Sequence, residues 1–371
     1  MTFYCRSGPL PYNHRTMVKP LLFASLLFLH VFAAFPERKV IVPVNAAKPV
    51  GPYSPGISAG EYLYVSGQGV RDAQSNVPAG VAAQAKQCLE NVKAIVEAGG
   101  LTLEHLVHMQ LYLERLSDLP EVEKVYAGYF PNNPPARVIL GTAKMPTDTP
   151  IEMTAVAVRD LKAKQVLTLK SLKPSFEPLG HASAAVAVGQ RIYPSAVYGK
   201  NKAEVEQKLA RVLAELKATA VMRNEYGVKV DAALPMTALP EGAQAALSVI
   251  ALRNTGGKQP AADVCVADGA TVFCQVQAAC ACDELDVQGE VKAVFKLLQT
   301  GLAKHGATLA HAVATNVYLD DITEFKLMNE TYASFFAAAP PTRTTVQPFA
   351  KAERAQRATP LVRISLVAVK E

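Results

Sequence analysis

Residues 99–140 read GGLTLEHLVHMQLYLERLSDLPEVEKVYAGYFPNNPPARVIL, and residues 305–346 read HGATLAHAVATNVYLDDITEFKLMNETYASFFAAAPPTRTTV. The two stretches align without a gap, which is the signature of a repeated structural unit. So many coincidences at one constant spacing are not due to chance. The identical pairs include Gly100 and Gly306, Tyr112 and Tyr318, Pro135 and Pro341, and Arg137 and Arg343.

A shorter third copy lies between these two. PVGPYSPGISAGEYLYVSG (49–67) aligns with PLGHASAAVAVGQRIYPSA (178–196), and residues 144–159 align with residues 238–253. The length missing from the middle copy corresponds to one strand and the second helix of a full copy. We therefore predict a full first repeat (47–161), a shortened second repeat (172–255) and a full third repeat (256–371).

The first repeat predicts an α+β fold. Its apolar residues recur at helical spacing over 79–100, where Gly99 and Gly100 end the run, and again over 119–130. Strand-like runs surround these helices, in the order strand-strand-strand-helix-strand-helix-strand-strand. Each repeat should therefore form a mixed sheet with both helices on one face. The other face is also apolar, so we expect the sheets of the sibling repeats to cover it.

The N-terminal segment is not expected to belong to the fold. Lys19 precedes an apolar stretch from Leu21 to Ala34, and small residues end it before PERK. This pattern predicts a secretory signal peptide over residues 1–34, so the mature protein would be exported, either periplasmic or secreted. The alternative is an uncleaved segment that anchors the protein to a membrane.

Composition excludes some classes of function. The net charge of +6 is spread along 371 residues without a basic block interleaved with aromatics, so no nucleic-acid partner is expected. The five cysteines that follow the leader are an odd number for a disulfide framework and lack the spacing of a metal site. We expect buried thiols and no metal.

Two charges stand in strongly apolar runs, Arg137 in PPARVIL and Glu152 in PIEMTAVAV. A buried charge without a partner is costly, so Arg137 must meet a carboxylate. That carboxylate either belongs to the protein, with Glu152 itself a candidate, or to a ligand held bidentately by the guanidinium.

The motifs GPYSPG, VSGQ, ENVKAIVEAGG and PPAR, followed by a glutamate that opens the last strand, resemble the Rid family of reactive intermediate deaminases, also called YjgF-like or L-PSP endoribonuclease-like proteins. The resemblance covers nearly all of the first repeat. It implies a chorismate-mutase-like fold, homotrimers with ligand pockets between subunits, and hydrolysis of 2-imino acids to 2-oxo acids and ammonia without a cofactor. Some members are described instead as ribonucleases.

The resemblance also implies roles for single residues. Arg137 would bind the substrate carboxylate and Glu152 would orient the attacking water, while Tyr53, Ser66 and Gly67 would line the pocket. Family pockets often carry an asparagine in the second helix and a cysteine two residues after the arginine. The first repeat has Glu123 and Ile139 at these positions, whereas the third repeat has Asn329 and Arg343.

Three functions follow as hypotheses. The first is an imine hydrolase with its site in the first repeat and wall residues from the third. The second is a non-catalytic protein that binds a small carboxylate or acts as a scaffold, and the third is a ribonuclease. The partner would be a small anionic substrate in the first two cases. The repeats could close into a pseudo-trimer within one chain, or the chain could form a homo-oligomer through its first repeat.

Overall fold

The computed structural model describes residues 37–169, 178–229, 232–253, 263–279, 286–336, 339–350 and 359–370. The predicted leader over residues 1–34 and the cysteines Cys5, Cys280 and Cys282 lie outside the described residues. Among the helices that are described, none is long and apolar enough to cross a membrane.

The first repeat forms a six-stranded mixed sheet in the order β1-β2-β3-β6-β4-β5. Strands β4 and β5 are parallel and are joined by α2, whereas the other neighbours are antiparallel. The elements are β1 (Lys39–Ile41), β2 (Gly56–Ala59), β3 (Tyr62–Gln68), α1 (Val81–Ala98), β4 (Leu106–Leu113), α2 (Leu119–Tyr129), β5 (Ala136–Gly141) and β6 (Ile151–Val158). The α+β class and the predicted element order are confirmed.

The third repeat follows the same path with five strands in the order β14-β15-β18-β16-β17. Here too the one parallel pair, β16 with β17, is joined by a helix. The elements are β14 (Cys265–Asp268), β15 (Thr271–Ala278), α4 (Val287–Ala303), β16 (Ala312–Leu319), α5 (Phe325–Ala333), β17 (Thr342–Val346) and β18 (Val362–Val369).

The second repeat is shortened differently from the expectation. Its strand β12 pairs Leu234 with Tyr226 of β11, as Leu140 of β5 pairs with Tyr112 of β4, so the last parallel strand is reduced to two residues rather than lost. Residues 228–233, between β11 and β12, are too few for a second helix of ordinary length. The elements are β7 (Lys164–Leu167), β8 (Ala185–Val188), β9 (Arg191–Pro194), β10 (Val197–Gly199), α3 (Lys202–Leu216), β11 (Ala218–Gly227), β12 (Leu234–Pro235) and β13 (Ala245–Arg253).

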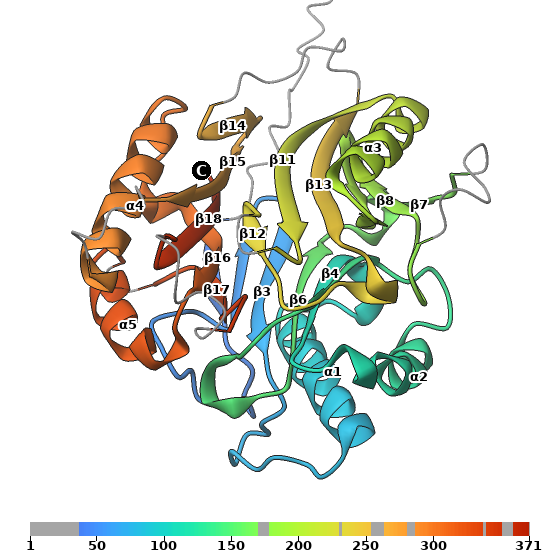
Figure 1. The fold of residues 1–371 in the computed structure, drawn as a ribbon, viewed down its shortest axis with the longest axis horizontal. Helices are drawn as coiled ribbons and strands as arrows, with labels where there is room; N and C mark the ends of the chain where they lie inside the picture. The colour runs from blue at the N-terminus through green and yellow to red at the C-terminus, as the bar shows by residue number, and fades with distance from the viewer. Residues whose placement is uncertain are drawn as a thin grey trace, which may run out of the picture. The chain divides into compact units, whose positions relative to one another are not determined.

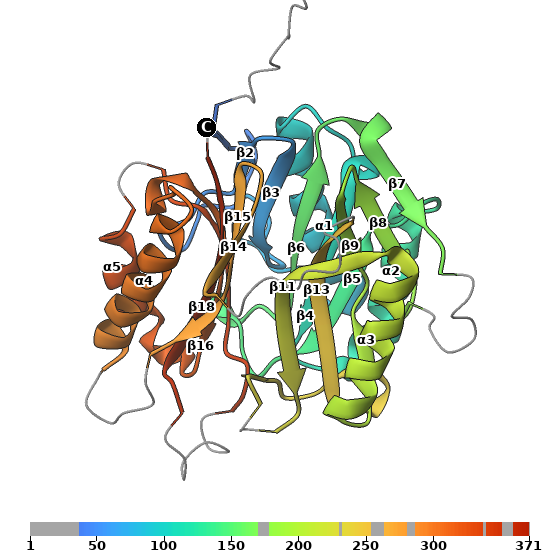
Figure 2. The same ribbon diagram turned by 90° about the horizontal axis from the view of Figure 1, so that it is seen from above.

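Each repeat has its own core between its sheet and its helices. The helix α1 turns Ala85, Cys88, Leu89 and Val92 onto its sheet, in agreement with the 3.6-residue spacing of the sequence. Equivalent cores lie under α3 and under α4 with α5. The helices therefore occupy the outer faces of the sheets (Figures 1 and 2).

The inner faces of the three sheets pack against one another. Tyr112, Tyr226 and Tyr318, which occupy equivalent strand positions, are fully buried in one shared cluster. Strand β5 of the first repeat contacts β9 of the second, β11 contacts β15, and β17 contacts β3. These contacts run in a cycle, so among the described residues each sheet packs against the other two.

The same hydrogen bonds recur at two of these contacts. Ser54 donates from its backbone N–H to the carbonyl of Pro341 over 3.1 Å and from its hydroxyl to the carbonyl of Pro340 over 2.6 Å. Ser183, at the equivalent position of the second repeat, bonds in the same way to the two prolines before Arg137. The turn that opens each of these repeats is thus fixed against the arginine-bearing strand of another repeat.

The cysteine expectation is corrected in part. Cys265 and Cys274 lie directly opposite each other on β14 and β15 and form a disulfide bond. Cys88 is a buried free thiol, as expected.

Candidate functional site

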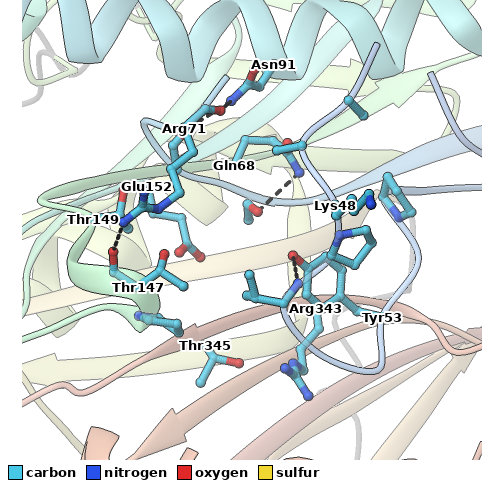
Figure 3. Close-up of a pocket in the computed structure, with 18 of the residues that line it drawn as sticks. Lys48, Tyr53, Gln68, Arg71, Asn91, Thr147, Thr149, Glu152, Arg343 and Thr345 are labelled. Atoms are coloured by element: carbon cyan, nitrogen blue, oxygen red, sulfur yellow. Dashed lines mark hydrogen bonds between the residues drawn. The ribbon is translucent and has the colours of Figure 1, made fainter. Parts of the chain in front are cut away.

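A cavity lies at the contact between the first and third repeats (Figure 3). Tyr53, Gly67 and Glu152 line it from the first repeat, and Arg343 and Thr345 line it from β17 of the third. Its volume of about 110 Å³ has room for several water-sized groups, and therefore for a small acid. Four residues predicted from the sequence thus meet in one place, although they come from two repeats.

Arg343 is one of three cationic residues that line this cavity. The residue is buried, and its guanidinium carbon lies 4.8 Å from the ring of Tyr332, 5.4 Å from Phe325 and 5.5 Å from Tyr53. Within the described residues, neither its Nη1 nor its Nη2 has a hydrogen-bond partner. Two buried donors of a charged group without acceptors are costly, so the arrangement suits an anion with two oxygens.

Asn329 lies beside this guanidinium. A side chain on Gly51 would place its Cβ 2.5 Å from Nη2 of Arg343 and 3.0 Å from Oδ1 of Asn329. Glycine at position 51 therefore lets the backbone approach both groups closely. The Oδ1 atom of Asn329 is likewise buried and unpartnered among the described residues.

Glu152 is the acid of the cavity, near the start of β6. Burial raises the pKa of its carboxyl to about 8, although the charge of Arg343 and the backbone N–H of Thr345 act in the opposite direction. The carboxyl is therefore mostly protonated at neutral pH, and both of its forms are present near pH 8. A group of this kind can both accept and give a proton under ordinary conditions.

Gly67 has no side chain, and the carboxyl group of Glu152 occupies the space that a side chain there would fill. A Cβ at this position would lie 2.0 Å from Oε1 of Glu152, so any other residue here would displace that carboxyl group. The register of β3 against β6 shifts between Val65 and Gln68, which marks a β-bulge beside the cavity. Ser66 in this bulge is buried and accepts a hydrogen bond from Gln68 over 2.7 Å, but it is not among the residues that line the cavity.

Tyr53 closes the cavity on the side of the opening turn. Its hydroxyl accepts a hydrogen bond from the backbone N–H of Val50 over 3.3 Å, and burial raises its pKa. The phenol therefore stays neutral and keeps its own proton to donate.

The expectation that Arg137 and Glu152 share a site is wrong. Arg137 lies at the contact of the first and second repeats, where its Nη2 lies 2.5 Å from Oε1 of Glu123 and donates to the carbonyl of Leu179 over 3.3 Å. The physical reason is the cyclic packing, because β5, which carries Arg137, contacts β9 of the second repeat, whereas Glu152 of β6 lies beside Arg343 and Thr345 of the third.

This second contact is closed by protein groups. Oε2 of Glu123 accepts from the backbone N–H of His181 over 3.0 Å, and a Cβ on Gly180 would lie 2.4 Å from the same oxygen. Ile139 is buried, and its backbone N–H donates to the hydroxyl of Tyr198 over 2.7 Å. Arg137, Glu123 and Ile139 therefore lie in a packed contact, with a carboxylate of the protein already on the arginine.

The third contact lacks the acid. In the strand register Glu152 lies opposite Tyr112. The equivalent position is occupied by Arg363, opposite Tyr318, in the third repeat and by Ala246 in the second. Gln275, which replaces the serine, bonds to backbone groups of Val221 and Arg223 across the contact. Among the described residues, only the contact of the first and third repeats combines an unpaired arginine with a buried glutamate.

The sequence did not point to several residues that line the cavity, among them Thr345, Lys48 and Arg71. Thr345 could have been found, because it stands two residues after Arg343, where the family often has a cysteine. Lys48 and Arg71 belong to no motif, and only the folded chain shows that they line the cavity. The described residues contain no cluster of three or more histidine, cysteine, aspartate or glutamate side chains that could hold a metal ion.

Comparisons with known proteins identify the family of the chain. The sequence profile of the family described as Endoribonuclease L-PSP matches residues 44–159 and 265–368, which is more than half of the chain. A 2-iminobutanoate/2-iminopropanoate deaminase of Escherichia coli is 41% identical over 125 residues, covering 33% of this chain and 98% of that protein.

Two further relatives match a single repeat. A RutC family protein of Pyrococcus horikoshii is 38% identical over 33% of this chain and 99% of its own length. The solved structure of Escherichia coli TdcF with bound serine is 35% identical, covers 33% of this chain and 99% of that chain, and superposes with a TM-score of 0.32.

Proposed function

Because the chain belongs to the Endoribonuclease L-PSP family, we propose that it hydrolyses 2-imino acids to 2-oxo acids and ammonia in the cavity between its first and third repeats. One observation carries this proposal: Arg343, whose Nη1 and Nη2 are buried without hydrogen-bond partners among the described residues, lines the same small cavity as Glu152. The deaminase activity named for the Escherichia coli relative supports the reaction class.

Arg343 would bind the carboxylate of the imino acid through Nη1 and Nη2. This bidentate contact fixes the neighbouring C=N carbon inside the cavity, where a water molecule can be held against it. Positioning of water and imine contributes most of the acceleration, because a protonated imine is already electrophilic.

Glu152 would move the protons. In its ionised form it takes a proton from the water as the water oxygen bonds to the imine carbon, which gives a tetrahedral carbinolamine. The carboxyl then gives this proton to the nitrogen, and the C–N bond breaks as the hydroxyl proton passes to the regenerated carboxylate, so that ammonia and the 2-oxo acid are released. The hydroxyl of Tyr53 is a donor for the oxygen or nitrogen on this carbon. One water is consumed, and no oxidant or cofactor takes part.

A second candidate is carboxylate binding without turnover. The unpartnered atoms of Arg343 call for a bound anion, but they do not require that this anion reacts. Ammonia release separates the two candidates.

The test uses purified full-length protein and freshly generated 2-iminobutanoate, with ammonia release as the readout. Arg343→Met and Glu152→Gln should each lower kcat/KM by about 100-fold or more. Arg137→Met, at the equivalent position of the first repeat, should retain activity, and Arg115→Met controls for loss of a surface arginine. Native protein no faster than buffer, or full activity in Arg343→Met, would overturn the proposal.

We also propose that the protein works outside the cytoplasm. The disulfide between Cys265 and Cys274 supports this, because such bonds persist mainly in oxidising compartments. Fractionation of expressing cells, with sequencing of the mature N-terminus, tests it, and a cytoplasmic protein with an intact leader would contradict it.

A further inference from the structure

The cavity carries more positive charge than one carboxylate can balance. Three cationic residues line it, Arg343, Arg71 and Lys48, whereas Glu152 is its one acidic lining residue. Burial raises the pKa of Glu152 to about 8, so this acid carries little negative charge at neutral pH. A ligand with a single carboxylate on Arg343 would leave two cations without a counter-charge.

Arg71 is held in position by backbone groups. Its Nη1 donates to the carbonyl of Ser75 and its Nη2 to the carbonyl of Thr147, each over 3.0 Å. A guanidinium has five N–H donors, so these two bonds leave further donors for a ligand. Asn91 fixes the backbone of Arg71 by donating to its carbonyl over 2.8 Å.

No acid of the described residues neutralises these two cations by an ion pair. The ion pairs of the described chain include neither Arg71 nor Lys48. Asp148, on the loop beside Thr147, pairs with Lys144 over 2.6 Å. Asp72, next to Arg71, accepts hydrogen bonds from Gln74 and Asn76. Both carboxylates are therefore bonded to other groups, although the pKa of Asp148 is lowered first by Lys144 and also by the nearby charge of Arg71.

The two cations lie apart from Arg343 along the lining. In the view of Figure 3, Arg71 and Lys48 stand on opposite sides of the cavity, with Gln68 between them, and the guanidinium of Arg343 lies at the lower edge. Lys48 is exposed, so it stands at the entrance rather than at the base. An extended ligand held at one end by Arg343 would present its other end toward this entrance.

We propose that the preferred substrates are 2-imino dicarboxylic acids, with the first carboxylate on Arg343 and the second recognised by Arg71 and Lys48. This inference rests on the proposed function for the imine, whereas the recognition of two carboxylates stands on the charges alone. Each charge-assisted hydrogen bond to the second carboxylate is expected to improve binding by about 10-fold or more.

Binding of the corresponding oxo acids tests recognition separately from turnover. Calorimetry with full-length protein should show 2-oxoglutarate binding at least about 10-fold more tightly than 2-oxobutanoate. Lys48→Met and the double variant Lys48→Met with Arg71→Met should progressively lose that preference, with unchanged affinity for 2-oxobutanoate. Lys48→Met leaves the bonds of Arg71 intact, so it remains informative if the double variant unfolds.

A matched control removes two equal charges elsewhere. Lys93→Met combined with Lys124→Met changes the net charge as much as the double variant and should keep the preference. Equal affinity for the two oxo acids, or equal loss of both in the Lys48 and Arg71 variants, would overturn the inference. A preserved preference without ammonia release from either imine would instead contradict the proposed function and leave the recognition of dicarboxylates standing.

Discussion

Arg137 lies 2.5 Å from the carboxylate of Glu123, whereas Arg343, at the same position of the third repeat, has Asn329 in place of that glutamate. One contact therefore places a carboxylate of the protein on Nη2 of Arg137, whereas at the other neither Nη1 nor Nη2 of Arg343 has an acceptor among the described residues. The Nε and Nη1 atoms of Arg137 are also without acceptors there, so the two contacts differ in the carboxylate and not in the number of unpartnered nitrogens. The duplication of the chain has produced one closed and one open version of the same site.

The closed contact should contribute to stability. Glu123→Gln would leave the buried charge of Arg137 without a counter-ion, and we expect a loss of about 2–3 kcal/mol in the free energy of unfolding, below the value for a fully buried pair because Glu123 is partly exposed. Denaturant unfolding measures this. The matched variant Asn329→Ala should lower the free energy of unfolding by less than about 1 kcal/mol. Equal losses in Glu123→Gln and Asn329→Ala would show that the ion pair does not stabilise the contact.

Gly67 and Glu152 should be coupled. Gly67→Ala forces a Cβ against the carboxylate, which should cost about 1–3 kcal/mol and abolish turnover. In the background of Glu152→Ala the same change should cost much less, because the group it meets is gone. A double-mutant cycle on unfolding free energies gives the coupling, and additive costs would contradict the described contact.

Glu152 should make stability depend on pH. Its folded-state pKa of about 8 lies above the ordinary value for glutamate, so the folded protein binds the proton more tightly than the unfolded chain. The resulting stabilisation is fully present below the ordinary pKa and is lost as pH rises through about 8. Between about pH 5 and pH 7, Glu152→Gln should therefore gain about 1.4 kcal/mol per pH unit relative to the native protein. Parallel stability curves for the two proteins would refute the raised pKa.

One chain should suffice for the complete assembly. The three sheets cover one another's inner faces, and Tyr112, Tyr226 and Tyr318 meet in a shared core. Light scattering of the purified protein should give the mass of a single chain. A mass three times larger would mean that the repeats of different chains assemble instead.

Much of the fold could be predicted because the same pattern of strands and helices occurs in two full repeats. The constant alignment of 99–140 with 305–346 carries the order of strands and helices from one copy to the other, and the apolar periodicity assigns each element. The remnant strand β12 escaped prediction, because two residues leave no periodic signal.

The residue types of the site could be predicted, but not which of the two arginines lies beside Glu152. Arg137 and Arg343 stand in the same motif, and sequence alone does not tell which of them faces Glu152. The decision depends on packing of distant strands, since β17 rather than β5 contacts β3. The available hint was that Asn329 and Arg343 both occur in the third repeat, whereas Glu123 replaces the asparagine in the first.

A crystal structure of the protein soaked with 2-oxobutanoate tests the central claim most directly. We predict the carboxylate of the ligand on Nη1 and Nη2 of Arg343, with its oxo carbon beside Glu152 and Tyr53. A ligand bound to Arg137, or a cavity at Arg343 that stays without ligand at saturating concentration, would contradict the assignment of the site to the contact between the first and third repeats.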